Sequence, residues 1–350
     1  MKTIEVSASR TYDVVIGSEL LPTLGQRVKA LSRATKAAII SDSNVFPLYG
    51  ETAVQSLRDA GLDVVHFVFP AGEESKNGQN YLEIVNFLAE NRLTRTDCLI
   101  ALGGGVVGDI TGFAAATYLR GIAYIQVPTT LLAAVDSSVG GKTAIDLPAG
   151  KNLCGAFCQP RLVLCDIDTL NTLPEDIFRD GCAEVIKYGI LYDDALFSSL
   201  ATAGLAFDRE SVIARCVELK RNVVMEDEFD TGARMKLNLG HTIGHGVEAS
   251  SHFQISHGKA VAIGTAIITR AAFSCGHCSE DTKNAILTVL ERFGLPTACE
   301  YDADMLLSSA LSDKKRAGNT VNLIVPRSIG QCNISPISVS ELLPFIKAGL

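Results

Sequence analysis

The sequence predicts two domains: an α/β domain with a mostly parallel sheet over residues 1–173, and an all-α domain over residues 174–350. Three observations predict this division. Short β-branched runs alternate with helical patterns in the first half. After Pro174 the strand signals nearly vanish and amphipathic helical stretches dominate. The length of 350 residues also favours two domains, because single cores stop growing at roughly 250 to 300 residues.

The individual elements follow from these patterns. Strands are expected at residues 12–16, 37–41, 64–69, 98–102, 123–127 and 161–165. Helices are expected at residues 44–60, 79–90, 177–191, 211–225, 258–273 and 279–293, among others. Since helices separate several of the strands, they should cover both faces of a parallel sheet, and ligands should bind at the carboxyl ends of its strands. A late strand at residues 320–325 has no identified partner.

Composition and charge exclude several classes of protein. Lysine and arginine total 31 against 39 aspartates and glutamates, so the net charge of −8 disfavours a nucleic-acid or anionic-membrane partner. No apolar stretch reaches the roughly 18 residues of a membrane-spanning helix, which predicts a soluble, cytoplasmic protein. The ten cysteines form no pair of C-x-x-C motifs and are expected as free thiols, because Cys275-Gly276-His277-Cys278 has no second half.

A glycine-rich segment predicts a phosphate-binding loop. The apolar run 99–102 reads as a buried strand, and Gly103, Gly104 and Gly105 follow it, where positive φ angles and close approach to an anion are expected. An ATPase P-loop at residues 141–143 is disfavoured, because Asp136 stands where that motif needs its first glycine. Asp42 ends an earlier strand and could accept hydrogen bonds from a ribose or adenine. Tight turns without a ligand are the alternative.

Histidines cluster in the second half of the chain. His241 and His245 are separated by four residues, which places both imidazoles on one helix face and, from spacing alone, favours them as a pair of metal ligands. His257 is expected at the start of the next helix, with Ser256 placed to cap it. Glu184 supplies a carboxylate within the same helical domain. The alternative is two histidines on a helix surface and one at a cap.

Several cations have small or apolar neighbours in the sequence, unlike the usual solvated charge. These are Lys142, Lys151, Lys187, Lys220 and Arg234. Close to a metal and a phosphate-binding loop, they would suit a multiply anionic substrate. A salt bridge between Glu184 and Lys187 on a helix surface is the alternative for that pair.

Five segments together carry a resemblance to a known family. They are GGGVVGD at 103–109, PTTLLAAVDSSVGGKTAID at 128–146, GKNL at 150–153, AEVIK at 183–187 and NLGHTIGH at 238–245. With these segments the chain resembles the 3-dehydroquinate synthases of the sugar phosphate cyclase superfamily, from Asp42 to Lys315. Relatives that cyclise other sugar phosphates differ around residues 140–143, where this chain keeps the dehydroquinate form.

The resemblance implies a Rossmann-like domain that binds NAD, a helical domain that holds Zn²⁺ (or Co²⁺ in its place), and a homodimer. The implied metal ligands are Glu184, His241 and His257, so that His245 becomes a substrate contact. The implied NAD contacts are Asp42, Glu73, Lys76, Gly103, Gly104, Gly105, Val106, Asp109, Thr129, Thr130, Lys142, Lys151 and Thr172. The implied substrate and catalytic residues are Asp136, Lys142, Asn152, Lys187, Lys220, Arg234, Asn238, His245, Lys314 (or Lys315) and Arg120, the last reaching the partner subunit's site.

The implied reaction converts 3-deoxy-D-arabino-heptulosonate 7-phosphate to 3-dehydroquinate and phosphate in the shikimate pathway. It would proceed by transient oxidation with NAD, elimination of phosphate, reduction and an intramolecular aldol closure. The main alternative is a metal-dependent polyol or alcohol dehydrogenase, which would accumulate NADH. A nucleotide-binding regulatory protein without turnover is a further alternative.

Overall fold

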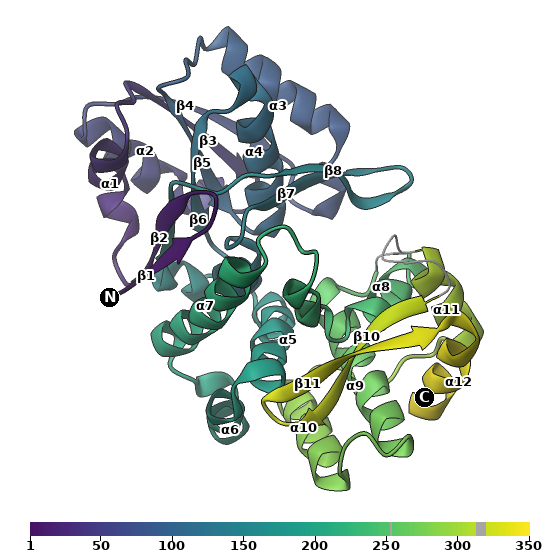
Figure 1. Cartoon of the computed structure of the whole chain (residues 1–350). Helices are drawn as coiled ribbons and strands as arrows, with labels where there is room; N and C mark the ends of the chain where they lie inside the picture. The colour runs from purple at the N-terminus through teal and green to yellow at the C-terminus, as the bar shows by residue number, and fades with distance from the viewer. Residues whose placement is uncertain (253, 313–319) are drawn as a thin grey trace. The chain divides into compact units, whose positions relative to one another are not determined.

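The computed structural model describes residues 1–252, 254–312 and 320–350, and divides into two compact units. Unit 1 contains Met1–Leu173 and Arg209–Phe229, and unit 2 contains Pro174–Asp208 and Asp230–Leu350. The first break falls at the expected boundary, but Arg209–Phe229 returns to the first unit, although the sequence prediction placed this segment in the second domain. Figure 1 traces the chain through both units.

Unit 1 is built on a seven-stranded sheet with the order β1-β2-β9-β6-β5-β3-β4. Its strands are β1 (Lys2–Ser7), β2 (Thr11–Gly17), β3 (Lys36–Asp42), β4 (Asp63–Phe69), β5 (Cys98–Gly103), β6 (Ala123–Pro128) and β9 (Leu162–Asp166). The antiparallel pair β1–β2 lies at one edge, and the other neighbouring strands pair in parallel. The mostly parallel sheet predicted from the sequence is confirmed.

Helices bury both faces of this sheet. They are α1 (Leu24–Leu31), α2 (Glu51–Asp59), α3 (Gly78–Glu90), α4 (Gly105–Thr117) and α7 (Arg209–Glu226). Alternate residues of β3 enter different cores: Ala37 and Ile39 pack on one face, and Ala38 and Ile40 on the other. This pattern explains why the strand has a continuous apolar sequence, since a strand covered on both faces has no polar side.

Three strands of unit 1 escaped the sequence analysis. β1 is the edge strand beside β2, and β7 (Lys142–Leu147) forms an antiparallel hairpin with β8 (Gly150–Phe157). The hairpin carries several of the expected functional residues. It also shows why the P-loop reading fails, because Gly141 and Lys142 lead into a strand and not into a helix.

Unit 2 is helical around a buried central helix. Its helices are α5 (Glu175–Tyr192), α6 (Asp194–Ala203), α8 (His241–Ser250), α9 (His257–Ser274), α10 (Glu280–Arg292), α11 (Ala303–Ser312) and α12 (Val339–Gly349). Most residues of α9 are buried, as expected for a helix that is apolar around its circumference. One correction to the all-α prediction is a hairpin of β10 (Thr320–Ser328) and β11 (Gln331–Ser338), which supplies the missing partner of the late strand.

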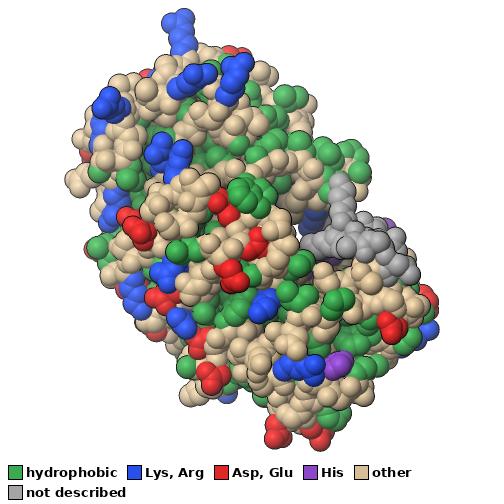
Figure 2. Space-filling view, viewed as in Figure 1, with side chains coloured by type: hydrophobic (Ala, Val, Ile, Leu, Met, Phe, Trp, Pro, Cys, Tyr) green, Lys and Arg blue, Asp and Glu red, His purple; other side chains and the backbone are tan. Residues whose placement is uncertain are grey.

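On the face drawn in Figure 2, basic side chains are scattered among acidic and apolar ones and do not form one broad basic patch. Among the described residues, no helix is both long and apolar enough to cross a membrane.

Candidate functional site

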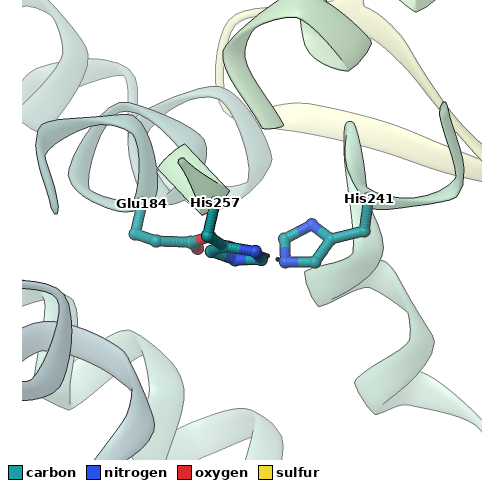
Figure 3. Close-up of side chains that lie close together, drawn as sticks. All are labelled: Glu184, His241 and His257. Atoms are coloured by element: carbon teal, nitrogen blue, oxygen red, sulfur yellow. Dashed lines mark ion pairs between the residues drawn. The ribbon is translucent and has the colours of Figure 1, made fainter. Parts of the chain in front are cut away.

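Three side chains from three helices of unit 2 converge on one point. Glu184 lies on α5, and His241 and His257 are the first residues of α8 and α9. The Oε1 atom of Glu184 is 3.5 Å from Nε2 of His241 and 3.3 Å from Nε2 of His257. Figure 3 shows the carboxylate and both rings pointing toward one another. The ligand atoms of this trio all lie within 4.8 Å of one another.

This geometry fits a divalent metal ion. Zinc binds nitrogen and oxygen ligands at about 2.1 Å, so two ligand atoms at a tetrahedral angle are about 3.4 Å apart. The two oxygen–nitrogen distances fall on either side of that value. Two imidazoles and one carboxylate are also a donor set that leaves a coordination position open for a substrate atom.

The outer nitrogen of each imidazole faces an acceptor. Nδ1 of His241 is 3.0 Å from the carbonyl oxygen of Leu239, and Nδ1 of His257 is 3.6 Å from Oε2 of the buried Glu248. A hydrogen on Nδ1 leaves the Nε2 lone pair directed at the centre, which is the usual arrangement around a metal-binding histidine.

Electrostatics distinguish the two imidazoles. Burial, followed by the nearby Lys187 charge, holds the pKa of His241 well below its usual value and favours the neutral ring. Burial acts in the same direction on His257, but hydrogen bonds with Glu184 and Glu248 outweigh it and raise the pKa of His257 to about 10. The protonated, positively charged ring of His257 is therefore favoured between Glu184 and Glu248.

Lys187 pairs with Glu184 within α5, and both side chains are only 2% exposed. The alternative of a surface salt bridge is therefore wrong for this pair. The two residues instead form a buried ion pair next to the two histidines.

Close packing of helix backbones brings the histidines together. Gly240, at the N-cap of α8, has a φ of +77°, and a Cβ there would lie 2.5 Å from the carbonyl oxygen of Val261. On α9, a Cβ at Gly264 would lie 2.1 Å from the carbonyl oxygen of Gly240. Only glycine permits this contact. The backbones of α8 and α9 can therefore cross closely near His241 and His257.

His245 lies outside the trio. Its ring centroid is 5.7 Å from that of His241 and 6.4 Å from that of His257. The metal-ligand group found among the described residues contains Glu184 and His257 with His241, in place of the pair that spacing alone favoured.

The other expected substrate residues of unit 2 differ in burial. Arg234 is 2% exposed and Asn238 partly buried, and both lie in the 3-10 helix η8 (Ala233–Asn238). The amide of Asn238 donates to the carbonyl oxygen of Met235 at 3.0 Å. Lys314 and Lys315 lie outside the described residues.

In unit 1, the expected nucleotide contacts gather at the carboxyl ends of the sheet strands. β3 pairs with β4 on one side and β5 on the other, so the strand order reverses between β3 and β5, where open parallel sheets bind ligands. Asp42 is the last residue of β3, and its Oδ1 accepts from the backbone N–H groups of Asn44 and Val45. Gly103 ends β5, and Gly104 is the N-cap of α4.

The glycine run serves close packing and not positive φ, which corrects the sequence prediction. None of Gly103, Gly104, Gly105 and Gly108 is among the residues with positive φ. A Cβ at Gly103 would lie 2.5 Å from the side chain of Val107, and one at Gly108 would lie 2.6 Å from Oε1 of Gln126. The run lets the N-terminus of α4 sit close to the strand ends, with backbone N–H groups available to an anion.

Thr129 and Thr130 follow β6 at the same edge. The N–H of Thr129 donates to Gly103 at 3.0 Å, and its buried hydroxyl oxygen has no hydrogen-bond partner in the described part of the chain. The Thr130 hydroxyl accepts from Ala133 N–H at 3.2 Å. Thr172 lies further along the edge and shares a hydrogen bond of 2.5 Å with Tyr49.

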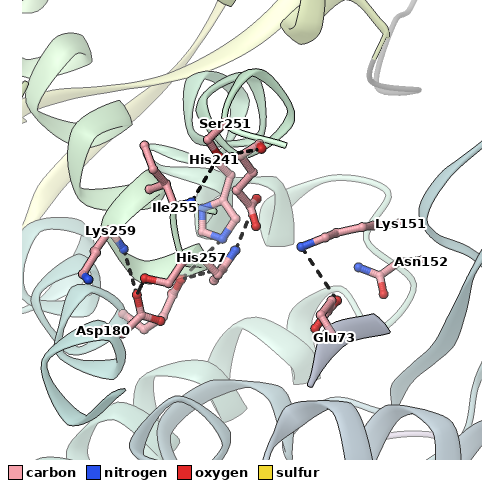
Figure 4. Close-up of polar contacts among 12 residues, drawn as sticks. Glu73, Lys151, Asn152, Asp180, His241, Ser251, Ile255, His257 and Lys259 are labelled. Atoms are coloured by element: carbon pink, nitrogen blue, oxygen red, sulfur yellow. Dashed lines mark hydrogen bonds and ion pairs between the residues drawn. The ribbon is translucent and has the colours of Figure 1, made fainter. Parts of the chain in front are cut away.

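A buried lysine joins several expected nucleotide contacts into one network. The Nζ atom of Lys76 lies 3.2 Å from both Glu73 and Asp109 and donates to Asn152 at 2.8 Å. These anionic neighbours hold the pKa of Lys76 well above its usual value even though burial, the largest effect, lowers it. Burial raises the pKa of Asp109 to about 6, and Lys76 opposes that rise. Lys151 lies 3.8 Å from Glu73, as Figure 4 shows.

The remaining expected residues of unit 1 lie on three elements. Asp136, in the π-helix η5 (Ala133–Ser137), pairs with Lys220 of α7, and this contact ties the returning helix to the first unit. Lys142 begins β7 with an exposed side chain. Arg120 is exposed in a turn where its φ is +66° and that of Leu119 is +52°.

Two residues at the metal cluster escaped the sequence analysis. Glu248 faces His257, and Asp180 of α5 accepts a hydrogen bond from the start of α9. Glu248 is seven residues after His241, so helical periodicity could have indicated that the two share a face. Asp180 gives no comparable signal, because its partners lie 76 and 79 residues away.

Two family models match residues 66–316, and curated relatives match nearly the whole chain. Residues 66–180 match the model described as 3-dehydroquinate synthase N-terminal, and residues 181–316 match the model described as 3-dehydroquinate synthase C-terminal. A 3-dehydroquinate synthase from Streptococcus suis is 44% identical over 343 residues, covering 96% of this chain and 97% of the relative. One from Pelobacter propionicus is 45% identical over 341 residues, covering 95% of each chain.

Solved structures place the fold among sugar phosphate cyclases. A 2-deoxy-scyllo-inosose synthase complexed with carbaglucose-6-phosphate, NAD⁺ and Co²⁺ covers 100% of both chains with a TM-score of 0.89 and 25% identity. A 2-epi-5-epi-valiolone synthase from Streptomyces hygroscopicus with NAD⁺ and Zn²⁺ bound covers 98% of both, with a TM-score of 0.88 and 26% identity. An iron-containing alcohol dehydrogenase, at a TM-score of 0.71 and 14% identity, shares the fold alone. The chain belongs to the 3-dehydroquinate synthase family.

Proposed function

We propose that this protein is a 3-dehydroquinate synthase that converts 3-deoxy-D-arabino-heptulosonate 7-phosphate to 3-dehydroquinate and phosphate. The observation that carries the proposal is the convergence of Glu184, His241 and His257 in a chain of this family. A bound NAD would supply a transient oxidation that is reversed within the turnover, so the proposed reaction would have no net redox change.

We assign NAD to the strand-end edge of unit 1 and a divalent metal to the trio of unit 2. The sugar phosphate cyclases of similar structure are described with NAD⁺ and with Co²⁺ or Zn²⁺, and two imidazoles with one carboxylate are a donor set that catalytic Zn²⁺ sites use. When bound, NAD supplies reversible hydride transfer at a carbinol carbon and the metal supplies Lewis-acid polarisation of substrate hydroxyls. The N-terminus of α4, the orphaned hydroxyl of Thr129 and the charged network around Lys76 support the assignment of the nucleotide.

The chain's own residues would bind and orient the substrate and move protons. Arg234 suits the substrate carboxylate, because a guanidinium can make two parallel hydrogen bonds to it. Asp136 and Lys187 would hold and release the proton of the reacting hydroxyl, and Lys220 keeps Asp136 in place. The phosphate contacts would be Lys142, Asn152, His245 and Arg120, with Asn238 and Lys314 as further substrate contacts.

Assembly and location follow from the same proposal. An exposed Arg120 in a strained turn suits a residue that completes the site of the partner subunit in a homodimer. All ten cysteines are free thiols, which supports a reducing, cytoplasmic location.

The test measures phosphate release from the heptulosonate phosphate, with and without NAD and with and without a metal chelator. We expect release that needs both NAD and metal, with no net rise in NADH absorbance. A polyol dehydrogenase would accumulate NADH in proportion to substrate oxidised, and this outcome would reject the proposal. A binding protein without turnover would bind NAD and release no phosphate.

A further inference from the structure

We propose that Asp180 is a positioning residue for the metal centre, because it fixes the start of α9, and therefore His257, against the helix that carries Glu184. The proposal rests on the metal site assigned above. Asp180 lies one turn before Glu184 on α5. It touches none of the three proposed ligands through a hydrogen bond or ion pair in the described residues.

The first observation is a helix cap supplied by another helix. Ser256 occupies the N-cap position of α9, but its side chain makes no capping hydrogen bond, contrary to the role that the sequence predicted for it. Its hydroxyl instead donates to Oδ1 of Asp180 at 2.5 Å, and the same oxygen accepts from the N–H of Lys259 at 2.9 Å. Asp180 therefore satisfies an N–H group of the first turn that has no partner within its own helix. Figure 4 shows the hydrogen bond between Lys259 and the Asp180 carboxylate.

Helices α6 and α10 of unit 2 are capped locally. Asp193 accepts from the N–H of Leu196 at the start of α6, and Ser279 accepts from the N–H of Thr282 at the start of α10. These caps stabilise only their own helices. The cap of α9 differs because it also joins two helices, each of which carries a proposed ligand.

The second observation is direct backbone contact at the same place. A Cβ at Gly258 would lie 1.9 Å from the carbonyl oxygen of Asp180, so α5 and α9 touch without an intervening side chain. Gly258 follows His257, and the Asp180 hydrogen bonds flank both residues. Together these contacts hold the start of α9 in register with α5, and the 3.3 Å separation between Glu184 and His257 depends on that register.

Removal of a purely structural cap and removal of a positioning residue should have different effects on metal binding. Loss of a cap lowers stability by about 1 kcal/mol wherever it occurs. Loss of an outer contact that orients a ligand also weakens metal binding, typically by about 10- to 100-fold. The measurement must therefore separate metal affinity from folding.

The experiment compares Asp180→Ala, Asp180→Asn and Ser279→Ala in the full-length protein. Zn²⁺ affinity is measured by competition with a chelator, the visible spectrum is recorded with Co²⁺, and stability is measured by urea unfolding of the metal-free protein. We expect Asp180→Ala to weaken Zn²⁺ binding about 10- to 100-fold and to change the Co²⁺ spectrum. Asp180→Asn keeps an acceptor oxygen and should stay within about 3-fold of the parent. Ser279→Ala should lose stability and keep its metal affinity.

The outcomes distinguish failure of the inference from failure of the proposed metal site. If Asp180→Ala lost stability like Ser279→Ala but bound Zn²⁺ like the parent, Asp180 would be a structural cap only. If the parent protein itself bound no metal, the proposed metal site would fail first. Should Asp180→Ala not fold, Ser256→Ala removes one of the two hydrogen bonds to Asp180, and unchanged metal affinity and Co²⁺ spectrum in that variant would contradict the proposal.

Discussion

The proposed nucleotide-binding edge of unit 1 and the candidate metal cluster of unit 2 are built in different ways. The edge draws on segments from Asp42 to Thr172, most of which follow the end of a strand or lie in a hairpin. Its recognition elements are largely backbone groups and a buried lysine. The cluster consists of three side chains whose distances depend on how α5, α8 and α9 pack. Local sequence signals therefore indicate the edge, whereas tertiary packing determines the cluster.

The strongest test of this contrast compares the packed ligand set with the local spacing rule. Glu184→Ala should weaken metal binding by about two to three orders of magnitude, because a site worth about 10 kcal/mol loses one of three ligands. His245→Ala, which removes the histidine favoured by spacing, should change metal affinity by less than about 10-fold. Metal affinity is measured by chelator competition and NAD binding by calorimetry, and both variants should bind NAD normally. If both variants lost metal affinity equally, His245 would be a metal ligand, as its spacing from His241 indicated.

A second test concerns the close helix crossing. Gly240 and Gly61 have nearly equal φ angles, +77° and +76°, but only Gly240 is surrounded by other atoms. Gly61→Ala should cost about 1 kcal/mol for the left-handed backbone alone. Gly240→Ala should cost about 3 kcal/mol or more, since its Cβ would also meet Thr265 at 2.3 Å. Urea unfolding measures both, and similar losses would show that α8 and α9 can separate without strain.

Much of the fold was predictable because its central strands are buried on both faces. The six strands expected in the first domain are all present to within about two residues, since continuous apolar runs bounded by turn residues carry a strong signal. The β7–β8 hairpin was not predictable in the same way. Strand β8 reads GKNLCGAF, with glycines, a lysine and an asparagine, and it forms because β7 lies beside it and not because of its own propensity.

The same distinction applies to the candidate site, where some residues were predictable from sequence and others depend on packing between helices. The family motifs placed Glu184, His241 and His257 together, but spacing within one helix pointed to His245. The capping role assigned to Ser256 failed because a carboxylate from another helix occupies that position. Sequence patterns describe what a helix can do alone, and they contain no information about a cap that another helix supplies.

The smallest expected effect concerns the charged network of the edge. Burial raises the pKa of Asp109 to about 6 in the folded protein, from 3.8 in the unfolded chain. Because the folded state binds this proton more tightly, the stabilising contribution is present below pH 4 and is lost as the pH rises through 6. A difference of about 2 between the two pKa values corresponds to at most about 3 kcal/mol.

Asp109→Asn removes this titration and should flatten the loss of stability between pH 4 and pH 6.5 relative to the parent. Urea unfolding across that range measures the difference between the two profiles. A flatter profile would show that the edge of unit 1 holds the ionised Asp109 at an energetic cost. Lys76 would offset only part of that cost. Parallel profiles for Asp109→Asn and the parent would mean that Asp109 ionises as easily in the folded protein as in water. In that case the edge would depend on its backbone groups, and burial would not disfavour the ionised form of Asp109.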